Sequence, residues 1–252
     1  MDASDFSFDG RAWPSSCVAR SRCVCDDRKT HGCGGEALAG ACILSRWIVT
    51  KRERTYNHIL DVGFGLVSKE NLSAITIGHI AGACGMSRSG VMAHFQNKED
   101  MHVAILERIR QAYVDQVVMP SHDEDALISL QKFLTAWCDW VHKAGYGKKA
   151  GCPLLKATAE YQDLPNDRVK KVIKRHQLEL IAHIQKMIDR CIRHGHLDVQ
   201  TDSQQMSFEI ISLYHGRNLA KTLIGRDAAN ATFWRAISRL LGTRIGQYKV
   251  TH

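Results

Sequence analysis

Residues 76–100 read TIGHIAGACGMSRSGVMAHFQNKED, and this segment contains the signals from which the architecture of the chain can be predicted. Thr76, Ser87 and Asn97 each stand directly before a helical pattern, and their side chains can accept a hydrogen bond from the first turn of a helix. Gly85 lies between the first two patterns, at a point where the chain has to turn sharply. The spacing therefore predicts two short helices followed by a long one.

A further helix is predicted before this segment, over about residues 54–68. Asn71 follows it, where a left-handed residue would end the helix. Two short helices joined by a tight turn are typical of a helix-turn-helix unit, whose second helix, here 88–94, lies exposed for the major groove of DNA. Met86 and Phe95 are predicted to fill the core of this unit.

The remainder of the chain is also predicted to be helical, so the fold class is all-α. Three of its four prolines, Pro120, Pro153 and Pro165, fall where helical patterns break. We expect a helix-turn-helix domain over 47–102 and a second helical domain over 103–252. Apolar residues recur with helical spacing in 54–67, 99–118, 126–142, 167–192, 204–224 and 231–241.

Residues 1–46 differ from the rest, because they are rich in Gly, Ser, Asp and Cys and sustain no apolar period. We expect this segment to be a disordered extension. The pairs Cys23-x-Cys25 and His31-x-Cys33 contain metal-ligand residue types, but they lack the paired C-x₂-C spacing typical of zinc sites. No metal or other cofactor is therefore expected.

Composition excludes several classes of protein. The 252 residues contain no apolar run long enough to span a membrane and no export signal near the start, so a cytoplasmic location is expected. The net charge of +8 comes mostly from residues 103–252, which carry 22 basic and 15 acidic side chains. No Gly-rich phosphate loop, nucleophile elbow or H-E-x-x-H motif is present, so the chain is not expected to be an enzyme.

The string Ile80-Ala81-x-x-Cys84-Gly85-Met86-Ser87, followed by His94-Phe95-x-x-Lys98-Glu99, resembles the DNA-binding domain of TetR-family transcriptional regulators. The sequence SRSGVMAHF at 87–95 is similar to the branch of the family with an SRSG-x-x-AHF recognition helix. Further along, GCPLL at 151–155 resembles the C-terminal domain of that branch. The whole resemblance spans about 54–242.

The resemblance implies which residues contact DNA. Helix N-termini attract phosphate, and the first residues of the recognition helix reach the bases. Met92 stands where many family members have a phosphate-binding tyrosine, and it can supply only an apolar contact. The candidate DNA-binding residues are Thr76, Ser87, Arg88, Ser89, Gly90, Met92, His94 and Lys98.

The resemblance also implies an effector pocket in the C-terminal domain, although aromatic residues at helical spacing are equally explained as plain core. A pocket of this composition favours a flat or apolar compound, and the basic surroundings admit a carboxylate. The candidate ligand-binding residues are Phe133, Trp137, Trp140, Cys152, Tyr161, His183 and Met187.

The last two predicted helices, 204–224 and 228–242, are apolar on more than one face, which indicates a partner. The resemblance implies that this partner is a second copy of the chain. The leading hypothesis is therefore a homodimeric repressor that binds a palindromic operator and is released by an unidentified small molecule. Alternatives are a thiol sensor that uses Cys138 or Cys152, a DNA-binding protein without a ligand, and a small helical enzyme.

Overall fold

The fold is helical throughout the part of the chain that the computed structural model describes, residues 50–145, 151–165 and 167–242. The predicted all-α class is confirmed for these residues. Residues 1–46, with their expected disorder and their metal-ligand residue types, lie outside them. The elements are α1 (Lys51–Lys69), η3 (Leu72–Ala74), α2 (Ile77–Cys84), α3 (Arg88–Met92), α4 (Lys98–Tyr113), η4 (Val114–Val118), η5 (Met119–Ser121), α5 (Ala126–Lys143), α6 (Pro153–Tyr161), α7 (Asp167–Arg193), α8 (Ser203–Ile224) and α9 (Arg226–Leu240).

Helix α1 begins at Lys51, about one turn before the predicted start. Thr50 and Glu53 form a reciprocal capping box, in which the Glu53 amide donates to the Thr50 hydroxyl at 3.1 Å. The Thr50 amide in turn donates to the Glu53 carboxylate at 2.8 Å. Two amides that would otherwise lack a partner are satisfied in this way, so the helix is stable from its first residue.

The three caps predicted in the following segment are confirmed. Thr76 accepts from the third residue of α2, Ser87 accepts from Gly90, and Asn97 accepts from the third residue of α4. Gly85 has φ 65° and ψ 31°, the left-handed conformation that the tight turn requires. Helix α3 is shorter than the predicted 88–94: it ends at Met92, and the chain continues in a turn.

The expectation for Asn71 is wrong. This residue has φ −80° and ψ 140°, an extended conformation, and it precedes the short helix η3. The reason is a tertiary contact, since the Glu160 carboxylate accepts hydrogen bonds from the amides of Leu72 and Ser73, each at 2.8 Å. Glu160 belongs to α6, a helix that the periodicity of the sequence did not predict.

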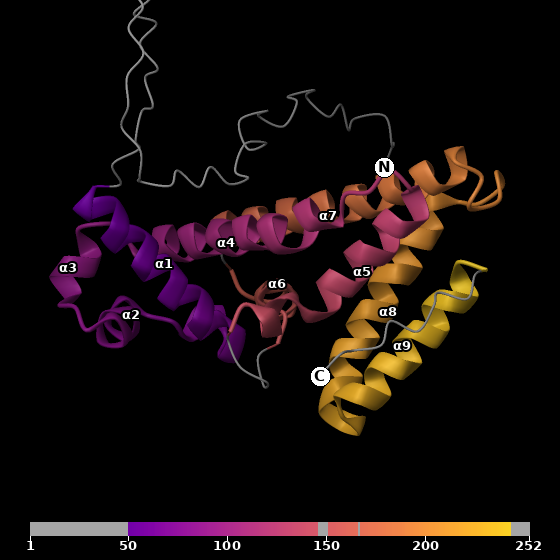
Figure 1. Ribbon diagram of the computed structural model, residues 1–252. Coiled ribbons are helices and arrows are strands. Elements are labelled where there is room, and N and C mark those ends of the chain that lie inside the picture. The colour runs from indigo at the N-terminus through magenta and orange to yellow at the C-terminus, as the bar shows by residue number, and fades with distance from the viewer. Residues whose placement is uncertain (1–49, 146–150, 166, 243–252) are drawn as a thin grey trace, which may run out of the picture. The chain divides into compact units, whose positions relative to one another are not determined.

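The first half of the structure is joined to the second by α4 and α6. Helix α4 runs beside α7 (Figure 1), and it ends in the π-helical turn η4 and the 3-10 turn η5. At the crossing of α1 and α4, a Cβ at Gly63 would lie 2.7 Å from Cδ1 of Ile105, so any larger residue would force the buried Ile105 side chain to move. In the described part of the chain, no helix combines the length and apolar character that crossing a membrane requires.

Candidate nucleic-acid interface and ligand cavity

Helix α3 is attached to the structure by a few apolar side chains and leaves its polar side chains exposed. Val91 is fully buried and Phe95 is 4 % exposed, so both belong to the core as predicted for Phe95. Met92 is 43 % exposed. The exposed side of the α3 segment is formed by Ser87, Arg88, Ser89 and Met92, with Gly90 partly buried beside them.

The start of α3 is held rigidly by hydrogen bonds. The Ser87 hydroxyl accepts from the Gly90 amide at 3.1 Å and lies 3.0 Å from the Ser89 hydroxyl. A Cβ at Gly90 would lie 3.2 Å from the Ser87 hydroxyl oxygen and 3.4 Å from Cε of Met86. The glycine therefore leaves room for the cap, and the backbone at this point can approach another molecule closely.

Arg88 extends back over α2 rather than away from the protein. A Cβ at Gly78 would lie 2.9 Å from its Nε and 3.1 Å from its Nη2, so the guanidinium rests on the surface that this glycine leaves open. Arg88 is exposed and forms no hydrogen bond or ion pair with the other described residues. The N–H donors of its guanidinium group are thus available to a guanine or a phosphate after a change of rotamer.

The other candidate contact residues surround α3. The Thr76 hydroxyl caps α2 at 3.1 Å from the His79 amide, and Lys98 donates to the Ser73 carbonyl at 2.5 Å. His94 lies 6.0 Å from the ring of Tyr56 on α1. Lys98 therefore already has a structural partner, whereas Thr76 remains exposed at the start of α2.

Sequence reasoning missed Arg52. This exposed residue of α1 donates from Nη2 to the Ala93 carbonyl at 3.4 Å, which brings the basic first turn of α1 next to the end of α3. Lys51 and Arg54 are exposed in the same turn. Three basic residues among positions 51–54 were a visible signal, but only the fold places them next to α3.

Helix α6 holds the helix-turn-helix unit against the rest of the structure. Lys156 donates to the carbonyls of Glu70 at 2.9 Å and Val67 at 3.3 Å, at the end of α1. Glu160 accepts from two amides of η3, as described above. Both ends of the α1–η3 connection are therefore fixed by charged side chains of one helix, at its second and third turns.

His102 completes this junction. Its Nε2 lies 2.8 Å from the Ile75 carbonyl, which can only accept, so Nε2 carries the proton and Nδ1 accepts from the Tyr161 hydroxyl at 3.1 Å. Burial lowers the pKa of His102 and raises the pKa of Tyr161 to about 12, so both groups are neutral near pH 7. Tyr161, a candidate ligand-binding residue, therefore takes part in the junction.

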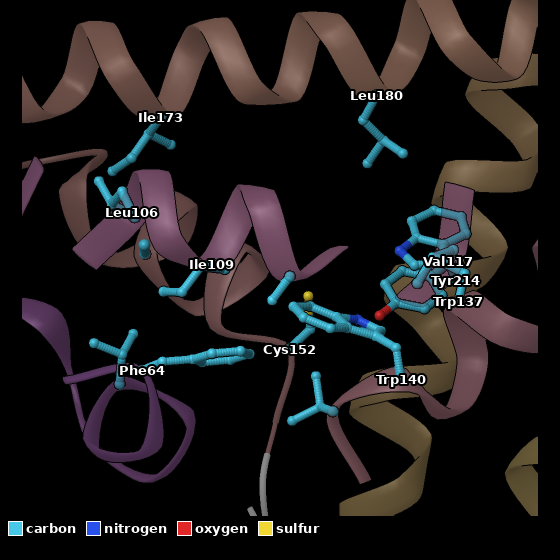
Figure 2. Close-up of a cluster of buried hydrophobic side chains, with 14 of the residues drawn as sticks. Phe64, Leu106, Ile109, Val117, Trp137, Trp140, Cys152, Ile173, Leu180 and Tyr214 are labelled. Atoms are coloured by element: carbon cyan, nitrogen blue, oxygen red, sulfur yellow. The ribbon is translucent and has the colours of Figure 1, made fainter. Parts of the chain in front are cut away.

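A small cavity lies between α5, α8 and the start of α6. Its volume is about 20 Å³, room for about one water molecule. Trp137 and Tyr214 stack on one side of it, with ring centroids 3.7 Å apart and an interplanar angle of 9° (Figure 2). It is lined by Trp137, Cys138, Trp140, Val141, His142, Cys152, Tyr214, Asn218, Lys221 and Arg226.

Three candidate ligand-binding residues, Trp137, Trp140 and Cys152, line this cavity. Phe133, His183 and Met187 do not line it and belong to the neighbouring core, where the rings of Phe133 and His183 lie 5.2 Å apart. The four lining residues from α8 and α9 were not predicted. They carry no local motif, because it is the crossing of α8 over α5 that makes them neighbours of the tryptophans.

The thiols at the cavity are poor nucleophiles. Burial raises the pKa of Cys138 to about 12 and also raises that of Cys152. A reactive thiol needs a lowered pKa and access to solvent, since the thiolate is the reacting form. These surroundings therefore disfavour the thiol-sensor alternative at both residues.

An exposed helix-turn-helix unit, joined through α4 and α6 to a larger helical part that contains a small cavity, defines the class of helix-turn-helix regulatory proteins. Sequence comparison identifies the particular family. Residues 59–105 match the profile described as bacterial regulatory proteins, tetR family, and residues 126–237 match the tetracyclin repressor-like C-terminal domain. The chain belongs to the TetR family of transcriptional regulators. Both matched regions are those of regulators and not of enzymes, as expected from the sequence.

Individual relatives agree with this assignment. Over 60 residues the chain is 40 % identical to the HTH-type transcriptional regulator AcrR of Shigella flexneri, a match that covers 23 % of this chain and 28 % of AcrR. A TetR-family regulator from Cytophaga hutchinsonii has a similar fold, with a TM-score of 0.66 and 17 % identity over 79 % of this chain and 98 % of that one. For the TetR regulator of Legionella pneumophila the TM-score is 0.63, with 21 % identity over 73 % and 96 %.

Proposed function

We propose that this chain is a DNA-binding transcriptional repressor that acts as a homodimer and leaves its operator when a small molecule binds in the C-terminal part. Residues 47–102 would bind DNA, and residues 103–252 would bind the effector and the second copy. The observation that carries the proposal is α3, a short helix capped by Ser87 and held by Val91, with Arg88 and Ser89 exposed.

In this proposal Ser87, Arg88, Ser89 and Gly90 approach the edges of the bases in the major groove. The amides at the start of α2, beside the exposed Thr76, bind a phosphate, because a helix N-terminus favours negative charge. Met92 supplies an apolar contact such as that with a thymine methyl group. His94, Lys98 and Arg52 are placed around α3 and would hold the DNA backbone.

The homodimer is supported by the outward face of α8. Phe208, Leu219 and Leu223 are 65 %, 65 % and 73 % exposed. With about 100° of rotation per residue, these three and the exposed Ser212 and Gly216 fall within one arc of about 80°. Large apolar residues flanking small ones form a surface onto which another helix can pack closely, and a C2 dimer would place the same face opposite itself.

The release of DNA would pass through α6. Cys152, the N-cap of α6, lines the cavity, and Lys156 and Glu160 of the same helix bind the backbone of α1 and η3. An effector that prefers a wider cavity would shift α6, and with it the separation of the two α3 helices in the dimer. A compound with equal affinity for both forms would change nothing.

A mobility-shift titration with DNA upstream of the protein's own gene tests the proposal, with competitor DNA present and at several salt concentrations. Saturable binding that survives competitor is expected, since base contacts persist where phosphate contacts are screened. Affinity equal to that for random DNA at every salt concentration, with this segment and with a genomic library, would contradict sequence-specific binding.

The same assay examines the alternatives. Treatment with peroxide or diamide is expected to leave the affinity for DNA unchanged, because Cys152 is buried, Cys138 is half-buried, and both thiols have raised pKa values. A regulator without an effector would show no response to any compound that binds the cavity.

A further inference from the structure

The described residues contain one buried guanidinium whose donors are largely unused. The side chain of Arg217, on α8, is 1 % exposed. Its Nε donates to the Asn230 side chain on α9 at 2.7 Å, but Nη1 and Nη2 have no hydrogen-bond partner. The nearest carboxylate oxygen, on Asp139, is 3.8 Å from Nη2. Leaving such donors desolvated and unpaired is costly, so this arrangement calls for an acceptor that is supplied by another molecule.

Positive charge is in excess around Arg217. Arg226 binds the same Asp139 carboxylate at 2.8 Å, and Lys221 lines the cavity one helical turn after Arg217. Three cations thus surround one carboxylate. Burial lowers the pKa of Lys221, and the charges of Arg217 and Arg226 lower it further. A second anion at this position would relieve the repulsion among the three cations.

The wall beside these cations is aromatic. Trp137 and Tyr214 are stacked on one another, and Trp140 lies next to them (Figure 2). The Nε1 donor of Trp140 is buried without a partner, so this wall also offers an unused hydrogen bond. Aromatic surface at one end and unpaired donors at the other match a compound with a flat apolar body and an anionic group.

We infer that the effector is an aromatic carboxylate, whose carboxylate binds Arg217 and Lys221 while its ring contacts Trp137, Trp140 and Tyr214. This inference rests on the proposed function and names the class of compound that acts at its cavity. The cavity has a volume of about 20 Å³, which holds only a water-sized group, and Arg217 lies behind its lining residues Lys221 and Asn218. The compound must therefore widen the gap between α5 and α8 before its carboxylate reaches Arg217. Cys152 at the start of α6 lines the same gap, which connects this widening to the helix-turn-helix unit.

Thermal unfolding of the full chain tests the inference, with benzoate, cinnamate, indole-3-acetate and 1-naphthoate, each compared with its neutral amide. At least one acid is expected to raise Tm in a concentration-dependent manner while its amide does not. If no acid in the series raises Tm more than its amide, the inference is wrong.

Two variants locate the site. Arg217→Met removes an incompletely paired buried charge and is expected to fold, because an apolar residue of similar volume is tolerated at such positions. Lys221→Met changes a half-buried residue and is the second variant should Arg217→Met not fold. Each is expected to weaken binding of the acid about tenfold or more, since a charge-assisted hydrogen bond is lost. The control Lys174→Met removes one exposed charge from α7 and should bind as the parent chain does.

The outcomes separate this inference from the proposed function. Unchanged binding of the acid by both variants would overturn the inference, even if DNA binding and release occur as proposed. Conversely, an acid that binds through Arg217 and Lys221 but leaves the DNA complex intact would support the site and contradict release by this class of effector.

Discussion

The α2–α3 pair and the α8–α9 pair both leave one face exposed, but with opposite chemistry. On α3, a helix of five residues, and its N-cap Ser87, the exposed side is formed by three hydrogen-bond donors, Ser87, Arg88 and Ser89, together with Met92. On α8 the exposed side chains include Phe208, Leu219 and Leu223, on a helix of 22 residues. A short polar helix can enter a groove that offers acceptors, and a long apolar one gains stability only by removing area from water.

This difference shows how one chain directs two partners to two sites. The buried area needed for a stable dimer comes from the long helix, whereas sequence specificity for DNA comes from a few hydrogen-bond donors in fixed positions. Each prediction below alters one of the two faces, or the junction of α4 and α6 that connects them.

The largest effect is expected from the double variant Leu219→Glu/Leu223→Glu. Two carboxylates on the outward face of α8 would meet their copies across a C2 interface, where burying like charges costs several kcal/mol. Sedimentation should show a monomer, and affinity for the operator should fall about 100-fold or more, because two half-sites are no longer bound together.

Leu178→Glu is the matched control, since Leu178 is 41 % exposed but lies on α7. It should remain dimeric. A double variant that sediments and binds DNA like the parent chain would show that α8 does not form the interface.

On the polar face, Arg88→Ala is expected to weaken specific DNA binding by about 1–3 kcal/mol, because a bidentate contact to a base is lost. Competition titrations at fixed salt measure this, and Lys174→Ala provides a control for the loss of one charge. If Arg88→Ala reduces affinity for operator and random DNA equally, then Arg88 contacts phosphate and does not read bases.

The connection between the faces is tested by Glu160→Ala. Loss of the carboxylate leaves the amides of Leu72 and Ser73 without their acceptor, and the free energy of unfolding should fall by about 1–2 kcal/mol. Urea unfolding measures the change, with Glu124→Ala, an exposed residue outside the junction, as control. Glu160→Gln keeps one acceptor oxygen and should lose less; equal losses in both variants would mean that packing, and not hydrogen bonding, holds η3.

The smallest effect concerns pH. Burial lowers the pKa of His102 below its usual 6.5, so the unfolded chain binds more protons than the folded chain as pH falls through that value. The contribution of His102 to the free energy of unfolding is therefore fully present above about pH 7 and is lost as the pH falls. Tm should be lower at about pH 5.5 than at about pH 7.5.

His102→Gln should reduce this pH dependence, because it removes the titrating group and leaves a donor for the Ile75 carbonyl. The buried His176 and the half-buried His183 and His215 also have lowered pKa values and will retain part of the dependence. An identical pH profile for His102→Gln would show that the junction does not contribute to it.

Much of the helix-turn-helix unit could be predicted because its signals are local. The caps at Thr76, Ser87 and Asn97 and the turn at Gly85 each depend on interactions within about four residues. Asn71 could not be predicted in the same way, since its conformation follows from the carboxylate of Glu160, 89 positions later in the chain.

The cavity was predictable only in part. The spacing of Trp137 and Trp140 marked an aromatic face on α5, but nothing local distinguished core from cavity wall. Lys221 and Arg226 became neighbours of those rings through the crossing of α8 and α5. Tyr161 was selected as a pocket residue on its type, and its hydroxyl bonds to His102 instead.

The sequence by itself determined the helical class, the longer helices and the short capped helix with exposed donors, because helix periodicity and capping are properties of neighbouring residues. Only the tertiary structure decided that α6 joins the cavity to the helix-turn-helix unit, and that Arg217 is buried with unused donors. Those features arise where helices distant in sequence cross, and the energies that decide them, desolvation and hydrogen bonding between elements, depend on positions that no local pattern encodes.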